Sequence, residues 1–428
     1  MSQLPSPRTR AEAAEADRLD PLAQFRSEFL VDPGAPLYLD GNSLGRPPRA
    51  TAGVVREVLD EWSRELVGGW GRWVELPAAV GDRIGQLVGA GAGQVVVSDS
   101  TTVNLYKLAM AAVDARADRL VLVGDANDFP TVRYVLQGIA ARQGRRVRFI
   151  DTDPVEGVET DAVADALGDD VGLVCLSGVN YRSGAVVDIE AVNAAAHRVG
   201  ALTLWDLSHA AGAVLLQLDA TGADLAVGCG YKYLNGGPGA PSWLYVRTEL
   251  QRSLRQPIWG WWGQADQFAM GDAYDPVPDA GRFQAGTPAI IGIAALDAGI
   301  APLLAAGMPA LWEKTKRLVG FLAARAEDVL TPLGARCASP SNPDRRGGHF
   351  AVSHPHAWAA TRALIERGLV VPDFRAPDVI RLAPAAIYTS YAEVWDAIER
   401  VAGVIADPSV RDGVPNNVTV IGGRFRPS

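Results

Sequence analysis

The chain has 428 residues, of which 48% are apolar, and this is enough for a large core and two or three domains. Its net charge of -9 and isoelectric point near 5.2 argue against nucleic acid or an anionic membrane as the main partner. The polar N-terminus lacks the apolar run of a signal peptide, and no apolar stretch is long enough to span a membrane. We therefore expect a cytoplasmic protein.

The three cysteines, Cys175, Cys229 and Cys337, are far apart in the sequence. Their odd number and their spacing favour neither a disulfide framework nor a metal site, so no metal is expected. Cys175 and Cys229 lie inside apolar runs and are expected in the core.

The first part of the chain is polar and is followed by a short apolar run and a glycine-containing loop. Apolar spacing favours helices, and clustered glycines favour loops. We expect helices at 10–19, 21–29 and 49–66, a strand at 37–40, and loops at 41–45 and 68–73. The tryptophan-rich 68–73 loop is either a packed corner or a lid.

Seven short apolar runs in the middle of the chain predict buried strands, at 95–97, 120–123, 147–150, 172–176, 202–205, 225–228 and 243–246. Helical stretches separate most of them, at 102–115, 131–143, 161–167 and 189–199. This alternation predicts an α/β fold with a mainly parallel sheet covered by helices on both faces. The last two strands have no helix between them, so one of them is free to run antiparallel.

The C-terminal part carries fewer strands and longer helices. A helix is expected at 311–330. Beyond it, strands at 350–353, 369–371 and 379–382 alternate with helices at 357–367 and 392–405. This pattern predicts a smaller α+β domain.

Lys232 follows the strand at 225–228 inside a glycine-rich stretch. An amine at the end of a buried strand is partly desolvated, which lowers its pKa and leaves it able to form a Schiff base with an aldehyde. A lone lysine in such a loop is more often a surface residue, so the neighbouring strand ends decide the interpretation.

Ligands of parallel sheets bind beyond the carboxyl ends of the strands, and several such ends carry informative residues. Thr101 and Thr102 open a helix whose N-terminus suits a phosphate, and the alternative for these hydroxyls is simple N-capping by Ser100 or Thr101. Phe129 offers an aromatic face, and Asp206 offers a carboxylate for a protonated pyridine nitrogen. With Lys232, these residues describe a site for pyridoxal phosphate (PLP).

Several stretches in the same order resemble kynureninase, and they cover nearly the whole chain. They are Tyr38–Gly45, Thr102–Leu105, Phe129–Thr131, Ser177–Tyr181, Trp205–Ala210, Tyr231–Asn235, Gly260–Gly263, and Arg381–Pro384 followed by Tyr388. The resemblance implies the PLP-dependent transferase fold of type I. It also implies three regions: an N-terminal segment packed on the small domain (1–66), a large PLP-binding domain (67–290) and a small C-terminal domain (291–428).

The resemblance further implies the hydrolysis of L-kynurenine to anthranilate and L-alanine in tryptophan catabolism. Lys232 would form the Schiff base and move protons, Asp206 would pair with the pyridine nitrogen, and Tyr231 would assist as a general acid. The implied cofactor-binding residues are Thr101, Thr102, Phe129, Pro130, Thr131, Val132, Ser177, Asp206, His209, Tyr231, Lys232, Trp261 and Thr287.

Two of these residues, Trp261 and Thr287, would reach the cofactor phosphate from a neighbouring subunit, which implies a homodimer with shared active sites. Arg381 would hold the substrate carboxylate with its planar fork, and Asn42 would also contact the substrate. Ordinary roles stay open for three residues: His209 as a core residue, Trp261 in interface packing and Arg381 in a surface ion pair.

One position departs from the family pattern, which usually has an acid directly after Phe-Pro-Thr, where this chain has Val132. Asp125 and Asp128 are the candidates to compensate for it. A second position, Gly286-Thr287, resembles the bacterial form of the family and favours kynurenine over its 3-hydroxy derivative.

Two other functions are kept as alternatives. A cysteine desulfurase-like lyase of the same fold would need a nucleophilic cysteine on a mobile loop, and Cys337 is the candidate, although no cysteine-histidine motif surrounds it. A non-catalytic PLP-binding protein is the second alternative, motivated by Val132.

Overall fold

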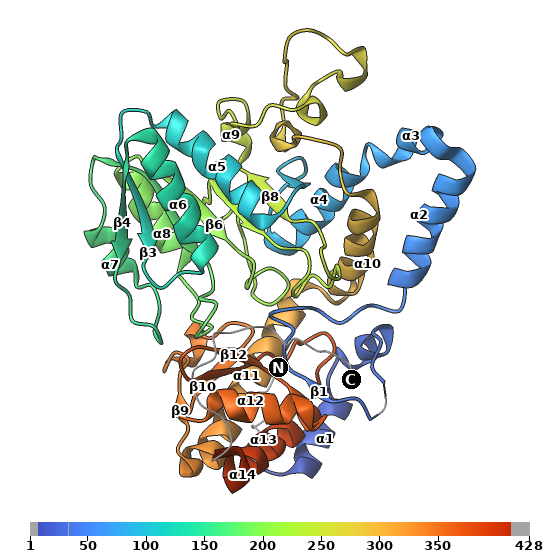
Figure 1. The fold of residues 1–428 in the computed structure, drawn as a ribbon, viewed down its shortest axis with the longest axis vertical. Helices are drawn as coiled ribbons and strands as arrows, with labels where there is room; N and C mark the ends of the chain where they lie inside the picture. Colours follow the sequence, from blue (N-terminus) through green and yellow to red (C-terminus); the bar gives the residue numbers. More distant parts are fainter. Residues whose placement is uncertain (1–6, 33, 412–428) are drawn as a thin grey trace.

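A seven-stranded sheet forms the centre of the larger part of the molecule (Figure 1). The computed structural model describes residues 7–32 and 34–411. The strands follow the order β2-β8-β7-β6-β5-β3-β4. Their bounds are β2 Val95–Val97, β3 Val121–Asp125, β4 Arg146–Ile150, β5 Val171–Ser177, β6 Leu202–Asp206, β7 Leu225–Gly228 and β8 Trp243–Val246. Only β8 runs antiparallel to its neighbours, so the predicted mainly parallel sheet is confirmed.

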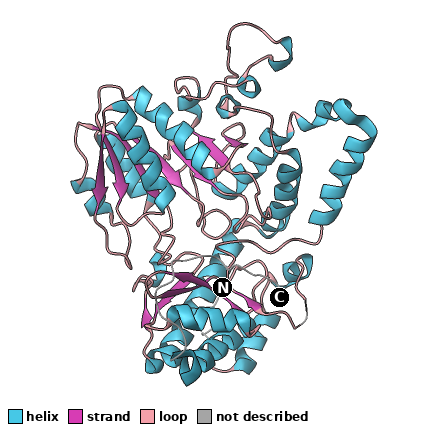
Figure 2. Ribbon diagram, viewed as in Figure 1, coloured by secondary structure: helices cyan, strands magenta, loops and turns pink. Residues whose placement is uncertain are grey.

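Helices cover both faces of this sheet, because successive strand residues point to opposite sides (Figure 2). Val96 belongs to a core that includes residues of α5 (Thr101–Ala115) and α6 (Pro130–Gln143). Val95 and Val97 point to the other core, with residues of α4 (Leu76–Val88) and α8 (Ile189–Arg198). The short α7 (Thr160–Asp165) packs beside α8.

The smaller part of the molecule contains a four-stranded antiparallel sheet in the order β12-β13-β10-β9. Helices α11 to α14 pack around it. The bounds are β9 Arg336–Cys337, β10 Phe350–Ser353, β12 Asp373–Arg375, β13 Val379–Leu382, α11 Met308–Leu330, α12 Ala357–Glu366, α13 Tyr391–Ala406 and α14 Pro408–Arg411. The two short strands β9 and β12 were not predicted, because two or three residues are too few to show periodicity.

The N-terminal residues contact the C-terminal ones. Helix α1 (Arg10–Arg18) packs on α13, and Asp17 accepts hydrogen bonds from the backbone N–H groups of Tyr391 and Ala392. Strand β1 (Leu37–Tyr38) pairs in parallel with β11 (Val370–Val371).

Helix α2 (Thr51–Glu65) packs along α10 (Ile290–Ala306) and then projects from the body (Figure 1). No residue of α2 is buried, and Trp62 is 56% exposed. Among the described residues no single helix has the length and hydropathy of a membrane span; α10 and the segment from Met308 to Leu333 meet that test only together, across a bend of 85°.

The glycine- and tryptophan-rich segment 68–73 is helical, so the loop expected there is wrong. A 3-10 helix, η2 (Leu66–Gly69), leads into α3 (Trp70–Trp73). The ring of Trp70 contacts those of Trp73 and Trp262, at centroid distances of 5.5 and 5.4 Å. Ring packing of this kind outweighs the weak helix propensity of glycine.

Short turns of helix connect the remaining elements. The helix expected at 21–29 is the 3-10 helix η1 (Ala23–Glu28). A single turn, α9 (Thr248–Gln251), follows β8. The other 3-10 turns are η3 Trp261–Gly263, η4 Gln267–Ala269, η5 Ala280–Phe283, η6 Thr331–Leu333 and η7 Pro343–Arg345.

Candidate active site

The sequence contains four lysines, and their surroundings differ in one decisive respect. Lys107, Lys314 and Lys316 each lie within 2.6 Å of a carboxylate oxygen. Lys232 forms no ion pair with any described residue, and its Nζ atom lies 2.9 Å from Nε2 of His209. Lys232 is half-buried, and an amine that is partly desolvated and has no carboxylate partner is the one best prepared to react as a neutral nucleophile.

Burial controls the protonation of this pair. Desolvation lowers the pKa of the Lys232 amine, although the nearby Cys229 and Asp206 favour its charged form. Desolvation also holds the pKa of His209 well below its ordinary value, and the neighbouring lysine charge adds to the effect. His209 is therefore neutral at physiological pH.

The ends of the parallel strands bring the predicted residues together around one cavity. Asp206 ends β6, Ser177 ends β5 beside it in register, and Lys232 follows β7. The cavity, of about 160 Å³, is lined by Ser100, Thr101, Thr102, Phe129, Thr131, Ser177, Val179, Tyr181, Asp206, Ser208, His209, Tyr231 and Lys232. Nine of the predicted site residues thus share one cavity, as expected for ligand binding beyond the carboxyl ends of strands.

The start of α5 forms one wall of this cavity. Ser100 is the N-cap, so the capping alternative holds for that residue, while Thr101 and Thr102 begin the helix. Beneath them the buried Lys107 amine lies 2.6 Å from both an Asp99 carboxylate oxygen and the Phe283 carbonyl oxygen. The helix N-terminus is therefore fixed from below, with free N–H groups facing the cavity side.

The loop after β1 packs directly on the Lys232 loop. The Gly45 N–H donates to the Tyr231 carbonyl at 2.8 Å. A Cβ atom at Gly45 would come within 2.4 Å of the Lys232 carbonyl oxygen, so only glycine fits this contact. Asn42, in the same loop, is fully buried, and its side-chain nitrogen and oxygen have no partner among the described residues.

Arg381 on β13 is fully buried rather than exposed, so the alternative of a surface ion pair is wrong. Its guanidinium pairs with Asp373 and also contacts the Tyr181 carbonyl and the Ser43 hydroxyl. The Nε atom of Arg381 has no partner within the described ranges. Desolvation lowers the pKa of the guanidinium, while the paired Asp373 opposes this shift.

Comparison with known proteins identifies the family. The family model of the kynureninase C-terminal domain matches residues 311–401. A kynureninase from Burkholderia pseudomallei is 38% identical over 93% of this chain and 96% of its own length, and one from Deinococcus radiodurans is 40% identical over 92% and 96%. The chain belongs to the kynureninase family.

The family assignment agrees with the fold. A solved C-DES mutant with glycine covalently linked to its PLP cofactor has a TM-score of 0.74 and 18% identity, over 86% of this chain and 96% of that one. The predicted fold type is therefore confirmed. PLP is the cofactor, as predicted for a member of the kynureninase family. The residues present also fit that group, because the cavity joins a half-buried amine without a carboxylate partner, a carboxylate, an aromatic face and a helix N-terminus.

Four of the predicted cofactor residues lie outside the cavity of this single chain. Pro130 begins α6, and Val132 is fully buried in the core between α6 and the sheet. Trp261 is 40% exposed and packs against Trp262 and Phe268. Thr287 is exposed in the loop before α10.

Sequence reasoning did not select several residues that the structure brings to the site. Ser100, Val179, Tyr181 and Ser208 line the cavity, and each follows or flanks a predicted strand, so the strand-end rule points to them. His349, which precedes β10, is fully buried with its ring 5.6 Å from that of His209. No sequence signal points to His349, because it comes from the other sheet.

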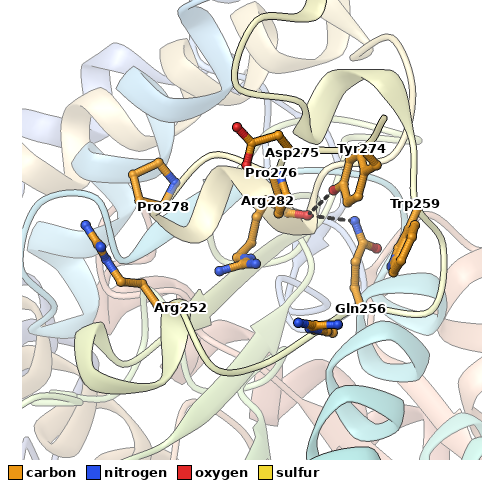
Figure 3. A pocket seen from close by; sticks show the side chains of 9 residues that line it. Arg252, Gln256, Trp259, Tyr274, Asp275, Pro276, Pro278 and Arg282 are labelled. Atoms are coloured by element: carbon orange, nitrogen blue, oxygen red, sulfur yellow. Dashed lines mark hydrogen bonds between the residues drawn. The ribbon is translucent and has the colours of Figure 1, made fainter. Parts of the chain in front are cut away.

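A second, larger cavity of about 470 Å³ lies away from the strand ends (Figure 3). Arg252, Arg255 and Arg282 contribute guanidinium groups to it, and Trp259 stacks on Tyr274 at its edge. None of the residues that could hold PLP lines this cavity. The cofactor chemistry therefore belongs to the smaller cavity.

The residues of the alternative functions lie elsewhere. Cys337 is exposed on β9 and lines a different cavity, and Cys175 and Cys229 are buried, as predicted. The described residues contain no group of three or more His, Cys, Asp or Glu side chains placed to hold a metal ion.

Proposed function

We propose that this chain hydrolyses the Cβ–Cγ bond of L-kynurenine to give anthranilate and L-alanine. The observation that carries the proposal is the half-buried Lys232 amine, which has no carboxylate partner among the described residues and lies beside His209 in the cavity that Asp206 also lines, in a chain similar to curated kynureninases over 93% of its length. Bound PLP supplies the electron sink that stabilises a carbanion at the substrate Cα.

The side chains around the cavity divide the proton transfers. The Lys232 amine takes the proton from Cα and returns one after cleavage, which requires the neutral form that its burial favours. Asp206 would keep the proton on the pyridine nitrogen of bound PLP, and Phe129 would offer its aromatic face to the ring. Tyr231 stays protonated at neutral pH because desolvation raises its pKa, so its hydroxyl is available as a general acid.

Substrate binding is assigned to the buried polar atoms between the two sheets. Asn42 has two unpaired side-chain polar atoms, and Arg381 has an unpaired Nε. Unpaired buried groups are costly, and a substrate carboxylate or carbonyl would satisfy them. Gly286 and Thr287 favour kynurenine over the 3-hydroxy derivative.

A homodimer with shared active sites accounts for the residues that the single chain leaves outside the cavity. Trp261 and Thr287 lie on an exposed segment, and large apolar side chains are exposed there and on α2. Contiguous exposed apolar surface is typical of protein interfaces. We also propose the three-part division at residues 66 and 290, a cytoplasmic location, and a place in tryptophan catabolism and NAD biosynthesis.

Incubation of the PLP-loaded protein with L-kynurenine, followed by anthranilate fluorescence, tests the proposal. We expect anthranilate and L-alanine in equal amounts, and less turnover of 3-hydroxykynurenine. Release of sulfide from cysteine without anthranilate would instead identify a desulfurase. A visible cofactor band without product from any of these substrates would identify a non-catalytic binder.

A further inference from the structure

Asp128 is a buried carboxylate that the proposed proton transfers do not use. It lies between β3 and α6, directly before Phe129, and is 3% exposed. Its Oδ1 atom accepts hydrogen bonds of 2.6 Å from the Phe129 N–H and the Ser177 hydroxyl. Its Oδ2 atom accepts one of 3.1 Å from the Ser177 N–H. All three donors therefore belong to residues that line the cofactor cavity.

The charges that face Asp128 are negative. Burial is the main cause that raises the pKa of Asp128 to about 7, and the nearby Asp206 and Asp125 carboxylates act in the same direction, against the hydrogen bonds from Ser177 and Phe129. The buried Cys175 thiol is its other titratable neighbour. No cation forms an ion pair with Asp128 in the described part of the chain. A buried carboxylate without a cation partner costs free energy. A cofactor that brings a positive charge into the cavity would offset this cost for Asp128.

The other candidate for this role, Asp125, is excluded by its contacts. Asp125 accepts from the Thr152 hydroxyl and the Asn127 N–H, at 2.7 and 2.8 Å, and so fixes its own loop. Val132 lies fully buried in an apolar core and is not part of the cavity wall. Asp128 is thus the acid that compensates for the missing carboxylate after Thr131.

We propose that Asp128 is a positioning residue of the PLP site, which holds Ser177 in place and adds a second negative charge beside Asp206. Ser177 and Asp206 are register partners on adjacent strands, so a carboxylate bound to Ser177 acts on the same end of the cavity. The two charges together keep the pyridine nitrogen protonated. This proposal depends on the PLP cofactor and is independent of the substrate.

The test uses cofactor affinity as its readout. Apoprotein is titrated with PLP and with 1-deaza-PLP, an analogue that carries carbon in place of the ring nitrogen. Asp128→Asn is expected to weaken the affinity for PLP about tenfold, which is the typical effect of losing one charged interaction. The affinity for the analogue should stay within about twofold of that of the wild type. A purely structural role would weaken both compounds equally.

Asp125→Asn is the matched control, because Asp125 is a buried acid of the same loop with hydrogen bonds of similar length. We expect it to lower the thermal stability of the apoprotein without changing the ratio of the two affinities. Ser177→Ala gives a second route if Asp128→Asn fails to fold. Ser177→Ala should weaken the affinity for PLP. Where both variants fold, the double variant should lose less affinity than the sum of the two single losses.

Equal losses for PLP and the analogue in Asp128→Asn, or the same selective loss in Asp125→Asn, would overturn the proposal. Because the readout is binding rather than turnover, a chain that binds PLP but does not cleave kynurenine would refute the proposed function and leave this inference standing.

Discussion

The cofactor cavity and the segment from residue 257 to 289 differ in how completely one chain builds them. At the strand ends, Asp206 and His209 are 6% and 8% exposed, and their neighbours hold them by hydrogen bonds within the chain. In the 257–289 segment, Trp259 is 61% and Phe268 58% exposed. The chain by itself therefore builds the cavity at the strand ends, whereas it leaves large aromatic side chains of the 257–289 segment exposed.

The difference follows from the elements that carry each region. Parallel strands end at one edge of a sheet, so residues distant in sequence meet there without further contacts. The 257–289 segment has only 3-10 turns and loops, whose own side chains bury little. The predictions below test each region and the link between them, beginning with the largest expected effect.

Replacement of Lys232 by alanine should remove activity by a factor of about 10⁴ or more, because both the Schiff base and the proton transfer depend on this amine. The visible band of bound PLP should also disappear. Anthranilate fluorescence and absorbance measure the two effects. Lys316→Ala, at a surface lysine paired with Glu313, is the control and should behave as the wild type. A Lys232→Ala variant that loses clearly less activity than this factor would contradict the assignment of Lys232 as the amine that reacts.

Much of this comparison is visible in the sequence. The seven strands were predicted because each is a short, mostly apolar run, and helical stretches separate most of them; the strand ends then predicted which residues meet. The unpaired state of Lys232 was not predictable, since the same spacing would allow a carboxylate beside it. The sequence also does not show whether Arg381 is exposed or buried. Its burial depends on the ion pair with Asp373, which lies on another strand.

For the segment 68–73, the local sequence pattern predicts the wrong structure. Its glycines predict a loop, yet the Trp70 ring contacts the rings of Trp73 and Trp262, and Arg72 pairs with Glu61 and Glu65. Trp262 comes 192 positions after Trp70 in the sequence. Contacts between such distant residues override local propensity and cannot be derived from the local pattern.

The electrostatic cost of the cavity gives a pH-dependent prediction. Asp128 has an ordinary pKa of 3.8 and one of about 7 in the folded chain, so the folded state binds its proton more tightly. Stability is therefore lost as the pH rises from about 4 to 7, by at most about 4 kcal/mol for this group. Asp128→Asn should remove that loss in the apoprotein.

Urea denaturation of both apoproteins at pH 5 and pH 8 measures the difference. Asp40, whose pKa burial also raises to about 7, titrates in both proteins and cancels in the comparison. A free energy of unfolding that falls equally with pH in the two proteins would mean that the buried charge of Asp128 is not the cause.

The link between the two regions is Lys107, which joins Asp99, directly before the cavity-lining Ser100, to the Phe283 carbonyl of the 257–289 segment. Lys107→Met keeps the apolar stem but leaves Asp99 without its cation. Removing one partner of a buried ion pair costs about 3 kcal/mol, so the midpoint of urea denaturation should fall. PLP affinity should fall as well, because the start of α5 loses its support.

A double variant separates these two consequences of Lys107→Met. Asp99→Asn with Lys107→Met removes both charges and should recover part of the stability. Unchanged stability in the single variant would show that Lys107 does not join the regions.

The smallest effect is also the most direct test of whether one chain can complete the site. Trp261→Ala should weaken the affinity for PLP about tenfold, because the variant loses roughly one favourable contact. If Trp261 acts from a second copy, mixing this variant with Lys232→Ala subunits should restore activity. In random mixtures half of the dimers carry one of each subunit, and each of these has one intact site, so about one quarter of wild-type activity is expected.

The same mixture gives a different result if each chain uses its own Trp261. Every site would then lack either the amine or the tryptophan, and only the weak activity of the Trp261→Ala subunits would remain. Saturating PLP masks that weakness, so the mixture must be assayed below the cofactor concentration that half-saturates Trp261→Ala. Restoration under these conditions requires Lys232 of one chain and Trp261 of another in a single site, which a monomer cannot provide.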